Sequence, residues 1–358
     1  MTRSRRRLAA VLVTACAVTA TVPAASADTA QAGRRHHAAA PRTVLVPLTD
    51  RRGAAPRVTY YDRRSRRIHD GSRSIRVAFP GLVTQVAEVR GGYVLVNQRD
   101  DVEARTTFRF VNPLGRSRVV GHGWFAYLTA VSADGSRIAF STGGARRTSV
   151  VRVADGRTAS RLFPRGGEVV ALGRIRALVT VGSHTVWWTP RTDRVGSYSG
   201  DGAYAADLTA RRVALLRGST SQTYVGSFPR GSRHRWVLPT AERVGRFADD
   251  DRRVLTLGHR RDQRTSRSYT LLRVRSTQRG ELLRTFAGRL DPVQDPRWEN
   301  ASTFLALVRA RHDRRGQVRE AWLRCRVGGR CERVSMVFTL DLASRQQSPL
   351  VLALQRTG

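Results

Sequence analysis

The sequence predicts an all-β protein that folds as a single β-propeller, with seven four-stranded blades closed by N- and C-terminal strands. Two observations lead to this prediction. Short runs of alternating apolar residues follow one another along most of the chain, separated by turns that contain Gly, Pro or Asp. The resulting strand–turn–strand hairpins recur about every 36 to 50 residues, which is the period of propeller blades. A β-sandwich would also contain many short strands, but not at this period.

The stretch 124–164 shows the repeating unit most clearly. Asp134-Gly135 and Asp155-Gly156 are typical of tight turns, because Asp supplies a side-chain acceptor and Gly tolerates a positive φ. The apolar-alternating runs around these turns predict strands at 128–131, 137–141, 149–153 and 158–163. A single four-stranded sheet leaves both of its faces uncovered. It must therefore stack against copies of itself.

Related hairpins occur before and after this unit. The seven predicted blades cover residues 57–77, 82–121, 124–164, 168–198, 205–238, 244–286 and 292–334. A lone apolar run at 43–48 precedes them, and the tail 337–354 offers one or two more strands. We expect these terminal strands to pair into the blades and close the ring, since closure removes exposed sheet edges.

One segment carries a resemblance to a known family. Residues 131–140 read V-S-A-D-G-S-R-I-A-F, which resembles the S-P-D-G-x-x-I-A-F signature of TolB-type, WD-repeat-like propellers, with Ala133 in place of Pro. Residues 298–307 are a degenerate version of it. The resemblance covers most of residues 44–350 by period and one blade by clear motif. It implies an extracytoplasmic scaffold for interactions, and it carries no known catalytic set.

The N-terminus has the three parts of a secretory signal peptide. Four arginines precede an apolar run at 8–22, and Ala25-Ser26-Ala27 matches an A-x-A cleavage site. We therefore expect a signal peptide at 1–27, a flexible linker at 28–42 and the propeller domain at 43–355, in a secreted or otherwise extracytoplasmic protein. No later segment approaches the roughly 20 consecutive apolar residues of a membrane span, so none is expected in the mature chain.

A second interpretation of the N-terminus is a bacterial lipoprotein signal. The tetrapeptide V-T-A-C at 13–16 loosely resembles a lipoprotein box, with Cys16 carrying the lipid anchor. The apolar run continues past Cys16, where a lipoprotein would turn polar. This observation favours cleavage after Ala27.

The other two cysteines fit an exported protein. Cys325 and Cys331 flank the turn R-V-G-G-R, so a hairpin with a three-residue loop at 327–329 would place them opposite each other, within reach of a disulfide. The alternative is a pair of free thiols. A pair at this spacing without further Cys or a close His is a poor zinc site.

The composition is strongly basic. The chain has a formal net charge of +37 with histidines counted as neutral. It contains no lysine, so its positively charged side chains are all arginines. Removing the four signal-peptide arginines leaves +33. Such a surface attracts polyanions in a salt-dependent way, which predicts an anionic envelope polymer or a protein as the partner. The alternative is a solvated basic coat that keeps an exported protein soluble.

Catalytic motifs are absent from the sequence. It contains no G-x-S-x-G elbow, H-E-x-x-H pair, P-loop or dinucleotide-binding glycine fingerprint. We therefore predict a non-catalytic binding or scaffold protein with no cofactor and no metal. The alternative is a propeller enzyme, a lyase or hydrolase, whose candidate residues at the channel mouth are His122, Glu168, Asp201 and Glu242.

The candidate partner-binding residues are arginines on the loops between the second and third strands of the blades. They are Arg146, Arg147, Arg260, Arg261, Arg311 and Arg314. Guanidinium groups bind carboxylates and phosphates bidentately, so a ring of them would form an anion-binding face. The turns predicted for the opposite face, which include Arg63, carry a similar number of arginines and weaken this assignment. His184, His259 and His312 fall on the same loops, where solvated histidines are more common than a metal site.

Aromatic residues fit the core better than a ligand site. Trp187 and Trp188 are adjacent in a predicted strand, so one faces each side of the sheet, and Trp322 lies where blades pack together. The Arg-rich loops lack interleaved aromatics of the kind that stack on bases. This composition disfavours nucleic acid as the partner.

Overall fold

The structure is a computed structural model, and the residues it describes all belong to the compact unit Pro41–Gly358. The described residues are 43–45, 48, 52–98, 105–142, 146–218, 220–228, 234–240, 242–262, 267–287, 296–309, 317–341 and 347–357. The side chains of residues 44, 45, 234, 235 and 259–269 are not among the described features. The predicted signal peptide, the linker and Cys16 lie outside these ranges.

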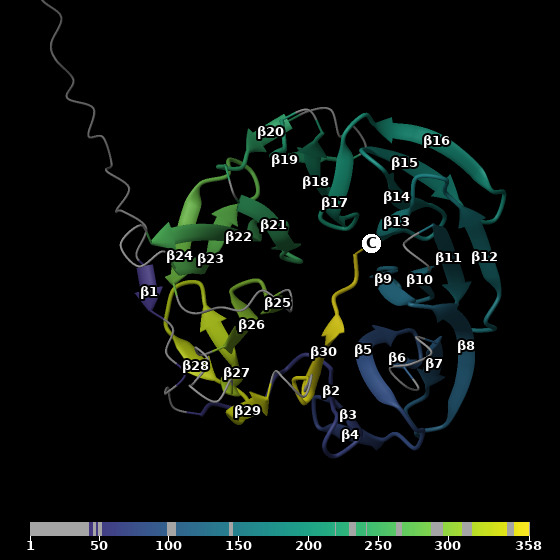
Figure 1. The fold of residues 1–358 in the computed structure, drawn as a ribbon, viewed down its shortest axis with the longest axis horizontal. Coiled ribbons are helices and arrows are strands. Elements are labelled where there is room, and N and C mark those ends of the chain that lie inside the picture. The colour runs from purple at the N-terminus through teal and green to yellow at the C-terminus, as the bar shows by residue number, and fades with distance from the viewer. Residues whose placement is uncertain are drawn as a thin grey trace, which may run out of the picture. The chain divides into compact units, whose positions relative to one another are not determined.

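Within this unit the described strands form six sheets, which are arranged around a central axis as a β-propeller (Figure 1). Three sheets have four strands. The first contains β9 (Tyr127–Val131), β10 (Arg137–Thr142), β11 (Arg147–Arg152) and β12 (Thr158–Leu162). The second contains β13 (Glu168–Leu172), β14 (Ala177–Val181), β15 (His184–Thr189) and β16 (Arg194–Ser199). The third contains β17 (Gly202–Asp207), β18 (Arg212–Arg217), β19 (Gln222–Ser227) and β20 (His234–Val237).

The remaining three sheets are larger. One five-stranded sheet contains β21 (Glu242–Phe247), β22 (Arg253–Asp262), β23 (Arg267–Ser276), β24 (Leu282–Ala287) and β1 (Thr43–Leu45). The other contains β25 (Arg297–Asn300), β26 (Thr303–Arg309), β27 (Gln317–Arg326), β28 (Cys331–Arg333) and β29 (Phe338–Asp341). The eight-stranded sheet contains β2 (Tyr60–Asp62), β3 (Arg67–Asp70), β4 (Arg73–Arg76), β5 (Leu82–Val89), β6 (Gly92–Gln98), β7 (Arg105–Val111), β8 (Ser117–Trp124) and β30 (Leu350–Leu354).

The all-β propeller prediction is therefore confirmed, but the prediction of seven four-stranded blades closed by N- and C-terminal strands is wrong. Five of the six sheets have four or five strands, and the sixth has eight. The cause is strand β30, which pairs antiparallel with β2 and parallel with β5, so that the first two predicted blades become one continuous sheet. The N-terminal strand β1 takes no part in this closure, because it pairs with the outer strand β24.

The core lies between neighbouring sheets, as stacking requires. One apolar cluster joins Phe108 of β7 to Phe140 of β10, whose rings stack at 4.2 Å, and another joins Phe163 to Trp188 of β15. Middle strands such as β10 are buried on both faces, whereas the outer strand β12 alternates between exposed and half-buried residues. The strands predicted for 124–164 agree with β9–β12 to within two residues at each end.

The turn in the TolB-like segment depends on its Asp and Gly residues. Asp134 Oδ1 accepts hydrogen bonds from Ser132 Oγ at 2.7 Å and from the Ser136 amide at 3.0 Å. Burial raises the pKa of Asp134, but these hydrogen bonds outweigh burial and lower the pKa to about 2. Gly135 has a φ of 65°, and a Cβ there would lie 2.6 Å from the Arg90 amide nitrogen. Only glycine fits this approach of two backbones.

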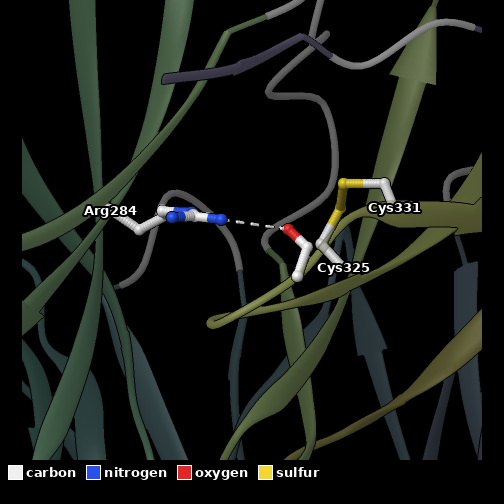
Figure 2. Close-up of a disulfide and its surroundings, with 4 residues drawn as sticks. Arg284, Cys325 and Cys331 are labelled. Atoms are coloured by element: carbon white, nitrogen blue, oxygen red, sulfur yellow. Dashed lines mark hydrogen bonds between the residues drawn. A yellow bond between two sulfur atoms is a disulfide. The ribbon is translucent and has the colours of Figure 1, made fainter. Parts of the chain in front are cut away.

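Cys325 and Cys331 form a disulfide, as the sequence predicts. They are direct cross-strand partners on β27 and β28, with a Cα–Cα distance of 4.1 Å. Figure 2 shows the disulfide beside the turn that joins these strands, where Arg284 donates to the Gly329 carbonyl at 3.4 Å. Both cysteines are buried. The disulfide therefore reinforces a hairpin that already belongs to the core.

Replacing both cysteines by alanine should lower the free energy of unfolding by about 2.4 kcal/mol, the chain-entropy value for so short a loop. Urea denaturation of the double variant and of the oxidised protein measures the difference. Intact-mass analysis should find both cysteines unreactive toward iodoacetamide until reductant is added. Labelling of the untreated protein would contradict the disulfide.

The C-terminal segment crosses the centre of the ring (Figure 1). After β30, the Thr357 amide donates to the Val131 carbonyl at 3.0 Å, and the Thr357 carbonyl accepts from Leu208 at 2.9 Å. Gln355 Nε2 donates to the Phe247 carbonyl at 3.3 Å. The segment thus links the ends of β9, β17 and β21, which belong to three different sheets. Within the described ranges, no helix is long and apolar enough to cross a bilayer.

Candidate functional site

A cavity with a volume of about 760 Å³ lies on the central axis. It is lined by the innermost strands of the sheets and by the C-terminal segment. Six charged side chains line it, namely Arg63, Glu168, Asp207, Arg246, Arg297 and Arg309. A central concave site of this kind is where propellers and other closed folds most often hold a ligand or a partner's side chain.

The two ends of the cavity differ. The innermost strands β9 and β13 start at Tyr127 and Glu168 and run in the same sense toward Val131 and Leu172. We call the end where they start the connection face, because the links 125–126 and 163–167 between sheets lie there. We call the other end the turn face. The C-terminal segment forms the floor of the cavity at the turn face, so the cavity is a cup that opens on the connection face.

Arg63 and Arg309 are held by other groups of the protein. Arg63 donates to the carbonyls of Val83, at 2.8 Å, and Ser348, and burial lowers its pKa to about 10. Arg309 donates to Glu320 Oε2 through Nε at 3.1 Å and Nη2 at 3.0 Å. The sequence analysis placed Arg63 on the face opposite the partner-binding arginines, which is the turn face, and this prediction is wrong. Because β30 supplies the innermost strand beside β2, the turn after β2 moves to the connection face.

Glu168 is different. Its side chain opens into the cavity, and no hydrogen bond or ion pair joins it to any described residue. Burial raises the pKa of Glu168, and no neighbouring cation opposes this effect. Tyr127 lies beside it, and its own pKa is raised by burial and then by the charge of Glu168. A carboxylate with a perturbed pKa on a cavity wall is a typical mark of a functional site.

Substituting Glu168 by glutamine should stabilise the protein at neutral pH. The raised pKa means that ionising Glu168 costs more free energy in the folded than in the unfolded chain, so the charged form lowers stability. We expect the melting temperature to rise by about 1–2 °C at pH 7. The gain should vanish as the pH falls below the ordinary glutamate pKa, where both side chains are neutral.

Thermal melts from pH 4 to pH 8 measure this difference. The matched control is Glu281→Gln, at an exposed turn residue beside Arg279. An equal gain at pH 4 and pH 7 would show that the effect of Glu168 is not due to its ionisation.

The four residues of the enzyme alternative do not come together. Only Glu168 lines the cavity. His122 is exposed on the outer strand β8, and Asp201 accepts a hydrogen bond from the Tyr224 hydroxyl. Glu242 is buried and forms ion pairs with Arg273 and Arg275 within its own sheet.

Comparisons with known proteins identify no family. No protein-family model matches the sequence, and no curated protein matches it. Among solved structures, Kluyvelomyces marxianus Hsv2 is similar with a TM-score of 0.48 and 10% identity over 79% of this chain and 100% of that chain. A putative 6-phosphogluconolactonase from Bacteroides uniformis has a TM-score of 0.49 and 11% identity over 79% and 92% of the two chains. The β-propeller domain of Myceliophteria thermophila Cps50 (Swd1) has a TM-score of 0.46 and 12% identity over 74% and 88%. At this level of similarity the neighbours carry no functional information, and the propeller fold rests on the strand pairing of this chain.

Several acidic side chains are used inside the protein. Glu242 accepts from Arg275 at 2.8 and 3.0 Å, from Arg273 and from Thr256 at 2.9 Å. Burial raises the pKa of Glu242, but these partners outweigh burial and lower it. Arg324, also buried, pairs with Glu299 at 2.5 Å and Glu332 at 2.9 Å. These acids are therefore not available to neutralise the exposed arginines.

Two of the six predicted partner-binding arginines can be placed with their side chains. Arg146 and Arg147 are exposed on the connection face, between β10 and β11, and no described hydrogen bond or ion pair involves either guanidinium group. Arg260 and Arg261 lie in β22, but their side chains are outside the described features, and Arg311 and Arg314 are outside the described residues. The structure therefore does not test a ring of six.

Two exposed aromatics were missed by the sequence analysis. Trp124 ends β8 and Phe125 follows it, and both are exposed on the connection face, next to Arg105. Trp124 and Phe125 lie at the end of β8 and on the link to β9, not on the Arg-rich loops between the second and third strands, to which the prediction referred. Their position in the sequence could have indicated exposure, because both residues lie between the last strand of one predicted blade and the first strand of the next. Trp188 and Trp322 are buried as expected. His184 is half-buried, and the described residues contain no group of three potential metal ligands.

Proposed function

We propose that this chain is an exported, non-catalytic β-propeller that binds an acidic protein partner through its connection face at the cell envelope. The observation that carries the proposal is the uneven use of charge. Acidic side chains pair with arginines inside the sheets, as at Glu242 and Glu299, whereas exposed arginines such as Arg146 and Arg147 have no described counter-charge. Such a surface gives long-range attraction and selects partners of opposite charge.

Four further features support export and a binding role. The sequence predicts a signal peptide at 1–27, and the Cys325–Cys331 disulfide is typical of oxidising compartments. The resemblance of residues 131–140 to the TolB-type signature fits an extracytoplasmic scaffold. Only Glu168 of the four candidate catalytic residues lines the cavity, which favours binding over catalysis.

Charge-reversal variants distinguish a binding face from a solvated coat. Arg146→Glu with Arg147→Glu changes the connection face, and Arg174→Glu with Arg176→Glu makes the same charge change at exposed arginines of the β13–β14 turn, on the turn face. Binding of each variant to immobilised poly-L-glutamate is measured as a function of salt. We expect the first pair to weaken binding at least fivefold more than the second. Equal losses would show a uniform coat and refute the proposed face.

A further inference from the structure

Exposed apolar and cationic residues lie at the strand ends on the connection face of the β5–β8 and β9–β12 segments. We call this set the aromatic–arginine rim, and it consists of Arg105, Trp124, Phe125, Arg146, Arg147 and Leu162. Its three apolar members are large and well exposed, at 54% for Trp124, 70% for Phe125 and 62% for Leu162. Exposed apolar groups gathered in one place mark interaction sites, whereas scattered ones do not.

Strand pairing shows that the strand ends carrying the rim residues adjoin across the two segments. Arg105 pairs with Trp124 on neighbouring strands. The next residue back along β8, Gly123, approaches Thr142 so closely that a Cβ would lie 2.5 Å from its methyl group. Thr142 is in turn the cross-strand partner of Arg147, and Arg147 is the partner of Leu162.

The aromatic part of the rim is held rigidly. The Arg105 guanidinium lies over the Trp124 ring at 5.2 Å. The Ala126 amide donates to Thr106 Oγ1 at 3.2 Å, which fixes the link between β8 and β9. Phe125 has a φ of 47°, a left-handed conformation that is strained for an aromatic residue. Strain of this kind is typical of functional positions, and here it directs a large apolar side chain toward solvent.

We infer that the rim is a docking site for an acidic polypeptide segment that carries aromatic side chains, a role that rests on the proposed function. Trp and Arg are the residues that most often dominate protein–protein binding energy, and rigid side chains lose little entropy on binding. The guanidinium groups of Arg146 and Arg147, which form no ion pair with any residue that the structure describes, select carboxylates. Apolar partners of Trp124, Phe125 and Leu162 must be side chains of the same segment.

The cup beside the rim favours a polypeptide over a lipid surface. Tyr127, two residues after Phe125, lines the cavity next to the unpartnered carboxylate of Glu168. A polypeptide can place a hydrogen-bond donor into this cup while it lies across the rim. A flat anionic bilayer cannot enter the cup. The short link between β8 and β9 also holds Trp124 and Phe125 at the rim and gives them no long loop for insertion.

Two acidic polymers that differ in aromatic content test this inference. The mature protein is titrated with poly(Glu,Tyr) and with poly-L-glutamate, and binding is followed by fluorescence anisotropy of labelled polymers. We expect tighter binding of poly(Glu,Tyr) by about tenfold. The double variant Trp124→Ala, Phe125→Ala should lose this preference while its binding of poly-L-glutamate stays within twofold. The matched control Leu114→Ala, Ile175→Ala removes exposed apolar side chains from the turn face and should keep the preference.

The outcomes separate the rim from the broader function. If poly-L-glutamate binds and depends on Arg146 and Arg147, but the preference for poly(Glu,Tyr) is absent or survives the Trp124 and Phe125 substitutions, the rim is not the docking site and the proposed function stands. If neither polymer binds, the proposed function fails as well. Vesicles of phosphatidylglycerol and phosphatidylcholine are the third probe. Vesicle binding that requires Trp124 and Phe125 would overturn the inference in favour of a lipid surface.

Discussion

Replacing Glu242 by alanine should lower the free energy of unfolding by about 3–5 kcal/mol, because it leaves the buried Arg275 and the half-buried Arg273 without their counter-charge. The Glu242 side chain is 2% exposed, and those of Arg273 and Arg275 are 24% and 10% exposed. Urea denaturation followed by circular dichroism measures the loss.

The matched control for this variant is Glu281→Ala. Glu281 is 61% exposed and lies 3.8 Å from Arg279, an exposed pair that should contribute less than about 1 kcal/mol. A pH series adds an independent check. Since the pKa of Glu242 is lowered in the folded protein, its contribution should be complete above the ordinary glutamate pKa and be lost as the pH falls through the lowered value. Similar losses for Glu242→Ala and Glu281→Ala would contradict the structural role of the Glu242 cluster.

Removing residues 350–358 should abolish folding of the propeller. Leu350, Val351 and Leu352 of β30 are buried, and each contributes about 1.5–3 kcal/mol through burial. Their sum is comparable to the entire stability of a typical protein, about 5–15 kcal/mol. The same truncation removes the pairing of β30 with both β2 and β5. Circular dichroism and the dispersion of NMR signals report whether a folded protein remains.

A shorter truncation separates the strand from the floor of the cavity. Removing residues 355–358 leaves β30 intact but deletes the hydrogen bonds of Gln355 and Thr357. This variant should fold and lose about 1–3 kcal/mol. If the longer truncation were as stable as the shorter one, β30 would not be the strand that holds the eight-stranded sheet together.

The repeating part of the fold could be predicted from local sequence. Asp134-Gly135 and Asp155-Gly156 define their turns by short-range hydrogen bonds and backbone conformation, so β9–β12 follow from the residues themselves. The pairing of β30 could not be predicted. It joins residues nearly 300 positions apart, and an apolar run such as Leu350–Leu354 fits several sheet edges equally well.

The candidate site was only partly predictable for related reasons. Glu168 was identified by its place at the start of a predicted innermost strand, and the structure confirms that position. Arg63 was assigned to the wrong face because its face depends on where β30 inserts. Trp124 and Phe125 were overlooked because exposure depends on packing between segments, which the hydrophobic pattern of a single strand does not record.

The pairing of β30 also affects the order in which the protein acquires its structure. Contacts between residues so far apart in the sequence form slowly. The other sheets therefore form first, and the ring closes only when β30 pairs with β2 and β5. Until β30 has paired with β2 and β5, the chain therefore remains loosely organised.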